Sequence, residues 1–216
     1  MNKQQKSLYR WLILAGVIIL AFLGVIFASQ NKPTTDSSGL TENEWFKGNK
    51  DATVILMEYS DFQCPACKSR EAILEPLIAE FSNHMKFVYR YYPLRNIHKN
   101  AQLSSQAAEA AGLQGKFWEM HGKLFETQSD WSELPNSEAK IKFTEYAETI
   151  GLDLTKFEAD LESEAVVDAV NEDYALAMAA KITGTPTFFL NGQEINIYDY
   201  EQARQTIRQA IETAAK

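Results

Sequence analysis

Residues 54–67 read VILMEYSDFQCPAC, and the fold of the chain can be worked out from this stretch outward. Its apolar run, 54–59, is typical of a buried strand. A short loop follows and leads to Cys64 and Cys67. From residue 68 to 82 the apolar residues recur at the spacing of a helix. The stretch therefore predicts a strand, a loop that carries two cysteines, and a helix.

The remaining sequence predicts further strands around a block of helices. A second strand is expected at 86–92, and 187–190 forms a third within the stretch GTPTFFLNG at 184–192. Asn191-Gly192 is a strong hairpin signal, so the chain should return as a strand over 193–197. Helical patterns cover 98–113, 116–127, 137–150, 154–162, 166–181 and 199–214, with a break at 130–135. This order predicts one α/β domain with a mixed sheet and a helical insertion at about 98–181.

Cys64 and Cys67 are the only cysteines in the chain, and they are separated by Pro65 and Ala66. A zinc site would need two further ligands, but the three histidines are scattered without ligand spacing, so no metal is expected. A purely structural disulfide would close so small a loop that it would constrain the unfolded chain very little. A redox-active disulfide at a strand-to-helix junction is the favoured interpretation, and no other cofactor is expected.

The expected position of the pair at a helix N-terminus gives the two cysteines different roles. With Cys64 as the N-cap, Pro65 is the first helical residue, where its missing N–H costs nothing. Residues three apart share a helix face, so Cys67 can reach Cys64. Unpaired N–H groups and the helix dipole should stabilise a thiolate on Cys64 and lower its pKa. Cys64 is therefore predicted to be the exposed attacking sulfur and Cys67 the resolving thiol.

Two other residues leave alternatives open. Glu58 is a charge inside an apolar strand; it either faces solvent on one side of the sheet or is a partly buried acid that passes protons to Cys67. Pro186 precedes the third strand, either as an edge feature or in a cis peptide, and sequence alone favours trans. Pro76 falls inside the helix after the cysteines, where it should produce a kink.

The segment EYSDFQCPAC at 58–67, together with GTPTFFLNG at 184–192, resembles the DsbA-like branch of the thioredoxin superfamily. The lead-in EWFKG at 44–48 and Tyr92-Pro93-Leu94, with His98 soon after, are similar to that branch too. The resemblance covers about residues 44–216. It implies a thioredoxin fold with a helical insertion between the second and third strands, which the pattern of elements predicts independently.

The resemblance also implies roles for single residues. Pro186 should be cis and face the disulfide, and Thr185 should offer its backbone to an extended substrate segment. The buried-acid interpretation of Glu58 is favoured. Candidate substrate-binding residues are Thr185, Pro65, Ala66 and Phe62. The best-known members have histidine where this chain has Ala66, so a less extreme oxidant is expected. His98 could be proposed as a substitute for that histidine, but a histidine that opens a helix is more often a surface or capping residue.

The N-terminal region predicts an anchor and a tether. Residues 11–28 form an 18-residue run without charge, long enough to cross the roughly 30 Å hydrocarbon core as a helix. A cleaved signal peptide is the alternative, although its apolar stretch is usually shorter. Basic residues on the flank before the run favour a cytoplasmic N-terminus, which places the domain at 44–216 outside the cytoplasm. Residues 29–43 read as a flexible linker.

The net charge and the cysteine pair together limit the functions that the chain can be expected to have. After the apolar run the chain carries 18 basic and 29 acidic residues, so nucleic acid is not expected as a partner. The favoured hypothesis is a monomeric dithiol oxidase for exported unfolded proteins, re-oxidised by a membrane quinone-linked partner, as the resemblance implies. An exported reductase or isomerase and a peptide-binding chaperone module are the alternatives; a chaperone should keep its activity when Cys64 is replaced by serine.

Overall fold

The computed structural model describes residues 39–41 and 43–215. The predicted membrane anchor at 11–28 and most of the predicted linker at 29–43 lie outside these residues. None of the helices in the described part of the chain is both long and apolar enough to cross a membrane.

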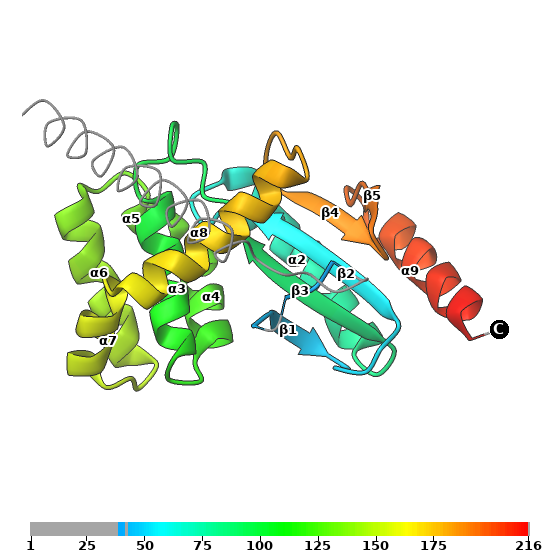
Figure 1. The fold of residues 1–216 in the computed structure, drawn as a ribbon, viewed down its shortest axis with the longest axis horizontal. Coiled ribbons are helices and arrows are strands. Elements are labelled where there is room, and N and C mark those ends of the chain that lie inside the picture. The colour runs from blue at the N-terminus through cyan, green and yellow to red at the C-terminus, as the bar shows by residue number, and fades with distance from the viewer. Residues whose placement is uncertain (1–38, 42, 216) are drawn as a thin grey trace, which may run out of the picture. The chain divides into compact units, whose positions relative to one another are not determined.

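A mixed five-stranded sheet forms the centre of the domain, in the order β1-β3-β2-β4-β5 (Figure 1). The pair β2 and β3 is parallel, and every other pair is antiparallel. The strands are β1 (Trp45–Gly48), β2 (Val54–Ser60), β3 (Met85–Tyr91), β4 (Thr187–Leu190) and β5 (Gln193–Ile195). The predicted mixed sheet is confirmed. The edge strand β1 was not predicted, because four residues that alternate between half-buried and exposed give almost no apolar pattern.

The helices follow the predicted order. Helix α2 (Pro65–Phe81) comes directly after the cysteine loop and runs on through Pro76. The insertion lies between β3 and β4, as predicted, and helix α9 (Tyr200–Ala214) closes the described chain. The insertion contains α3 (Ala101–Gly112), α4 (Phe117–Glu126), α5 (Gln128–Trp131), α6 (Asn136–Thr149), α7 (Leu154–Leu161) and α8 (Glu164–Ala179). The short helix α5 overlaps a segment that was predicted to be a break; four residues cannot show a helical period.

The sheet has a hydrophobic core on each face, because side chains alternate along its strands. Leu56 belongs to the larger core, which includes buried residues of α2 and α9, whereas Met57 and Tyr59 belong to a smaller core with Ala177 of α8. In Figure 1 the helices α3, α4, α6 and α7 gather at one end of the sheet, and α9 lies at the other. Glu58 alternates with Met57 and Tyr59, and so points toward α2 with Leu56.

An ion pair and a ring contact attach the lead-in segment, which begins at Glu44, to the rest of the domain. The buried guanidinium of Arg90 forms an ion pair with Glu44 and donates to the hydroxyl of Tyr59 over 2.7 Å. The indole ring of Trp45 stacks on Phe117, with 4.5 Å between the ring centroids.

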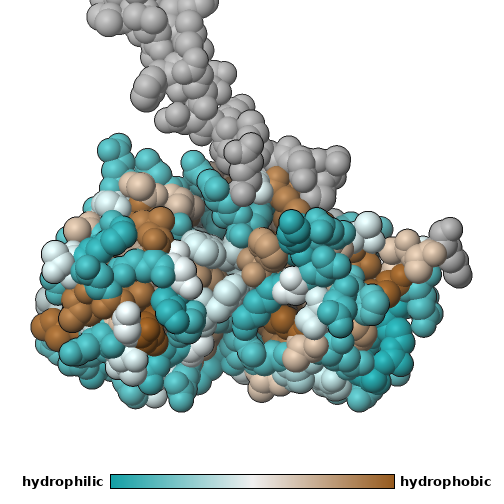
Figure 2. Space-filling view, turned by 90° about the horizontal axis from the view of Figure 1, so that it is seen from below, coloured by the Kyte–Doolittle hydropathy of each residue, from teal (hydrophilic) through white to brown (hydrophobic). Residues whose placement is uncertain are grey.

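On the face shown in Figure 2, hydrophilic side chains predominate and hydrophobic ones form separate small patches.

Candidate active site

Cys64 and Cys67 lie at the N-terminus of α2, as predicted. Cys64 is the N-cap with extended backbone angles, Pro65 is the first helical residue, and the Cys64 carbonyl accepts a hydrogen bond from the Lys68 N–H over 3.2 Å. Both cysteines are free thiols. Cys64 is 6% exposed and Cys67 is 0% exposed. Cys64 was expected to be openly exposed; it is nearly covered, but it is the cysteine of the pair that reaches the surface.

The two thiols differ strongly in acidity. A hydrogen bond from the Cys67 thiol is the main cause that lowers the pKa of Cys64 to about 5, against the opposing effect of burial. The side chain of Thr185 and the backbone N–H groups of Cys67 and Ala66 lower the pKa of Cys64 further. Burial raises the pKa of Cys67 well above its ordinary value, and the hydrogen bond to Cys64 and the charge of Glu58 act in the same direction. A thiolate therefore forms on Cys64 and not on Cys67.

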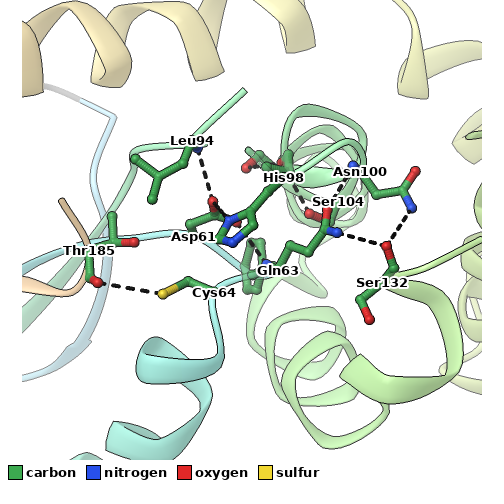
Figure 3. Close-up of polar contacts among 12 residues, drawn as sticks. Asp61, Gln63, Cys64, Leu94, His98, Asn100, Ser104, Ser132 and Thr185 are labelled. Atoms are coloured by element: carbon green, nitrogen blue, oxygen red, sulfur yellow. Dashed lines mark hydrogen bonds and ion pairs between the residues drawn. The ribbon is translucent and has the colours of Figure 1, made fainter. Parts of the chain in front are cut away.

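The turn before β4 faces the attacking cysteine. The Cys64 thiol lies 3.5 Å from the carbonyl oxygen of Thr185, to which it donates (Figure 3). The peptide bond between Thr185 and Pro186 is cis, and both residues are half-buried. Pro65 and Ala66, which directly follow Cys64 in the chain, are exposed. The Thr185 carbonyl and two exposed uncharged residues thus adjoin the cysteine that attacks substrate.

Glu58 is fully buried on the side of the sheet that faces α2. Neither of its carboxyl oxygens has a hydrogen-bond partner of normal geometry, although the nearby Ser60 hydroxyl partly stabilises the ionised form. Burial raises the pKa of Glu58 well above its ordinary value, and the charges of Glu71 and Cys64 raise it further. Burial likewise raises the pKa of Glu71, one turn after Cys67, to about 7. The solvated-face interpretation of Glu58 is therefore wrong, and its burial favours the protonated form of the carboxyl.

Phe62 is buried and has no surface that a substrate could reach. Its side chain is 0% exposed and packs against the rings of Tyr89 and Phe125, with centroid distances of 5.2 and 4.9 Å. The proposed substrate-binding role of Phe62 is corrected to a core role. An aromatic residue in a loop two positions before the attacking cysteine looks accessible in sequence, but the neighbouring helix α4 covers it.

Polar side chains from the helical insertion hold the cysteine loop in place. The Gln128 side chain donates to the carbonyl oxygens of Phe62 and Cys64 over 2.8 and 3.0 Å. Gln63 donates to the Ser132 carbonyl and accepts from the Asn100 N–H, both over 2.7 Å (Figure 3). These contacts join residues 37 to 69 positions apart in the chain. No local sequence pattern reports such contacts, which is why Gln63 and Gln128 were missed.

Asp61 of the cysteine loop forms a second polar pair with His98, which lies between β3 and α3. The Asp61 carboxylate is 0% exposed, and it lies 2.7 Å from Nδ1 of His98. The hydrogen bond to Asp61 raises the pKa of His98, and the charge on Cys64 raises it as well. His98 precedes α3 and was interpreted as a surface or capping residue; the structure pairs it with Asp61 instead. Within the described residues, no group of three His, Cys, Asp or Glu side chains is arranged to hold a metal ion.

A family model described as thioredoxin matches residues 40–212, and the chain belongs to that family. Within it, the fold is similar to that of DsbA-like proteins. BdbD from Bacillus subtilis superposes with a TM-score of 0.69 at 25% identity, over 78% of this chain and 93% of that one. For alpha-DsbA1 from Wolbachia pipientis the TM-score is 0.72 at 17% identity, over 82% and 94% of the two chains.

Relatives by sequence include much longer proteins. A protein named Na(+)/H(+) antiporter NhaA 1 from Salinispora arenicola is 38% identical over 152 residues, which are 70% of this chain and 22% of that protein. One of the same name from Mycolicibacterium vanbaalenii is 36% identical over 155 residues, which are 70% and 24% of the two chains. The chain thus spans about a fifth to a quarter of the length of the curated relatives it matches.

Proposed function

We propose that this protein is a thiol–disulfide oxidoreductase that works as a dithiol oxidase on exported, unfolded proteins. The observation that carries the proposal is the asymmetry of the cysteine pair. Cys64 has a pKa lowered to about 5 and a path to the surface, whereas Cys67 is sealed in and has a raised pKa. A stable thiolate is also a good leaving group, so this asymmetry favours a disulfide that is readily donated.

The reaction begins with the disulfide form of the pair. A substrate thiolate attacks Cys64, a bond forms between the two sulfurs, and the Cys64–Cys67 bond breaks with its electron pair on Cys67. A second substrate thiolate then attacks the substrate sulfur of the mixed disulfide. The substrate disulfide forms, and Cys64 leaves as the thiolate. The substrate dithiol is thereby oxidised and the enzyme disulfide reduced by two electrons, without any cofactor beyond the cysteine pair.

Glu58 supplies the proton that Cys67 needs when it leaves. A buried thiolate on Cys67 is strongly disfavoured, because burial raises the pKa of this thiol. Glu58 points toward the same helix and keeps its own proton because of burial. Transfer of that proton to the Cys67 sulfur leaves a carboxylate, which regains a proton from water once the substrate disulfide has departed. Glu58 thus serves as the general acid of the first step.

Thr185, Pro186, Pro65 and Ala66 form the surface that receives substrate. The Thr185 carbonyl oxygen lies 3.5 Å from the Cys64 sulfur, so an extended segment bound to this backbone would bring its cysteine to Cys64. Recognition through backbone atoms tolerates many sequences, as an enzyme for diverse unfolded chains requires. Exposed Pro65 and Ala66 carry no charge that would select one class of side chain.

The place of action and the partners are part of the proposal. The uncharged run at 11–28, with basic residues before it, supports a membrane-anchored monomer whose catalytic domain lies outside the cytoplasm. A membrane quinone-linked oxidoreductase would then return Cys64 and Cys67 to the disulfide. The reductase or isomerase alternative uses the same chemistry in another direction, and the oxidation equilibrium distinguishes it.

Stoichiometric oxidation tests the activity. The oxidised full-length protein is mixed with a reduced, unfolded protein that has two cysteines, and thiols are counted by alkylation and mass spectrometry. One substrate disulfide should form for each enzyme disulfide lost, and Cys64→Ser and Cys67→Ser should form none. The oxidase proposal fails if the wild type leaves the substrate thiols unchanged. A peptide-binding module would bind the substrate equally well in wild type and Cys64→Ser, with no change in thiols.

A further inference from the structure

The carboxylate of Asp61 accepts three hydrogen bonds. Its Oδ1 atom accepts from the Gln63 N–H over 2.8 Å, and its Oδ2 atom accepts from the Leu94 N–H over 2.9 Å and contacts His98 Nδ1 at 2.7 Å (Figure 3). An ionised carboxylate has only acceptor sites, so Nδ1 of His98 is the donor. The tautomer of His98 is thereby fixed, and Nε2 is the ring atom that gains or loses a proton.

Asp61 belongs to the turn that carries the reactive cysteine. The Cys64 N–H donates to the Asp61 carbonyl over 3.0 Å, so the side chains of Asp61 and Cys64 start from one tight turn. The His98 side chain is 17% exposed, while that of Asp61 is 0% exposed. The charged groups that act on His98 are Asp61, Cys64 and the more distant Glu133. Pro65 and Ala66, between the cysteines, contribute no charge.

A buried carboxylate this close to Cys64 creates an electrostatic problem. On its own, the negative charge of Asp61 would oppose a second negative charge on the Cys64 sulfur. A proton on His98 cancels that charge, so the pair as a whole no longer opposes the thiolate. We propose that Asp61 and His98 form a charge-compensating pair that stabilises the Cys64 thiolate as the leaving group of the exchange. The proposal rests on the thiol–disulfide exchange argued above, and it names the group that tunes it.

His98 acts on Cys64 through its charge and is a positioning residue, whereas Cys64 and Cys67 carry the covalent chemistry. Coupling between two sites is reciprocal: a Cys64 thiolate that favours protonated His98 is favoured by it to the same degree. In the disulfide form Cys64 has no charge. The pKa of His98 is therefore lower in the oxidised protein than in the reduced protein, and between those two values reduction takes up a proton at His98.

The coupling predicts a shift in the pKa of His98 and a shift in the pKa of Cys64, and each can be measured. A neighbouring unit charge in a water-like environment changes an ionisation constant by roughly threefold, which is about half a pKa unit. The ring resonances of His98 should therefore titrate at least about half a unit higher in the reduced protein than in the oxidised protein. This NMR measurement needs no substitution at the pair, so it does not depend on whether a variant folds.

Variants test the effect of His98 on the acidity of Cys64, which is followed by the thiolate absorbance of the reduced protein at 240 nm. His98→Gln should make Cys64 at least threefold less acidic, because Asp61 then stays uncompensated. The double variant Asp61→Asn/His98→Gln should restore most of that loss, since both charges are gone. The matched control is His84→Gln, which replaces an exposed histidine next to Met85, at the opposite end of the parallel strands.

Equal His98 titration in the two redox states would overturn the inference, as would a Cys64 titration in His98→Gln that matches the His84→Gln control. These outcomes are separate from the fate of the proposed function. A protein that shows the coupling but does not oxidise dithiols would refute the oxidase proposal and leave the charge pair standing. A protein that oxidises dithiols without the coupling would do the reverse.

Discussion

Replacing Glu58 by glutamine should change how stability depends on pH. Burial raises the pKa of Glu58 in the folded protein well above its ordinary value of 4.5. An acid whose pKa is raised by folding stabilises the fold fully at low pH, and this contribution is lost as the pH rises from about 4.5 toward the folded pKa. The loss is about 1.4 kcal/mol per pH unit. Between pH 5.5 and 7.0 the wild type should therefore lose stability that Glu58→Gln keeps, at up to this rate.

The assay is urea unfolding of the reduced protein at pH 5.5 and 7.0, followed by tryptophan fluorescence. The slope of free energy against urea should be the same in both proteins, so that the midpoints report stability. Titrating groups that do not interact with Glu58 contribute equally to the two proteins and cancel in the difference, whereas Glu71, whose charge raises the pKa of Glu58, is part of the measured effect. Glu158→Gln, at an exposed glutamate of α7, is the control and should follow the wild type. If Glu58→Gln keeps the pH dependence of the wild type, Glu58 is not the protonated buried acid assigned to Cys67.

Three further substitutions test contacts that hold the residues around the cysteine site in place. Glu44→Ala leaves the buried Arg90 guanidinium with only the longer ion pair to Asp173, at 3.9 Å, and should cost about 3 kcal/mol of unfolding free energy, measured by urea unfolding. Gly112→Ala places a methyl group 2.3 Å from the Trp45 ring and should cost about 2 kcal/mol; an unchanged melting midpoint would refute that contact. Gln128→Ala removes two hydrogen bonds to the cysteine loop, so it should lower stability by about 1 to 2 kcal/mol and speed amide exchange in that loop, which hydrogen-exchange mass spectrometry can detect.

The sequence predicts the elements of this fold well because its signals are local. The apolar run of β2, the cysteines at a helix start and the Asn191-Gly192 hairpin each lie within a few residues. The predicted insertion between β3 and β4 follows from the order of such elements alone. Elements too short to show a period, β1 and α5, were the ones that the pattern could not reveal.

The environment of the site depends on contacts that sequence does not display. Whether Glu58 faces solvent or α2 is decided by what packs on each face of the sheet, and whether Phe62 is accessible is decided by α4. The partnership of Asp61 and His98 joins residues 37 positions apart. Chemical identity of the reactive residues was therefore predictable, whereas their exposure and their charge partners required the tertiary structure.

The oxidation equilibrium of the cysteine pair tests the central claim most directly. The purified full-length protein is equilibrated in glutathione buffers of graded composition, and the reduced fraction is measured by alkylation of Cys64. A leaving group with a pKa near 5 predicts a potential near or above about −180 mV, as in an oxidising folding compartment. A potential near that of thioredoxin, about −270 mV, would contradict the oxidase account and make the protein a reductase.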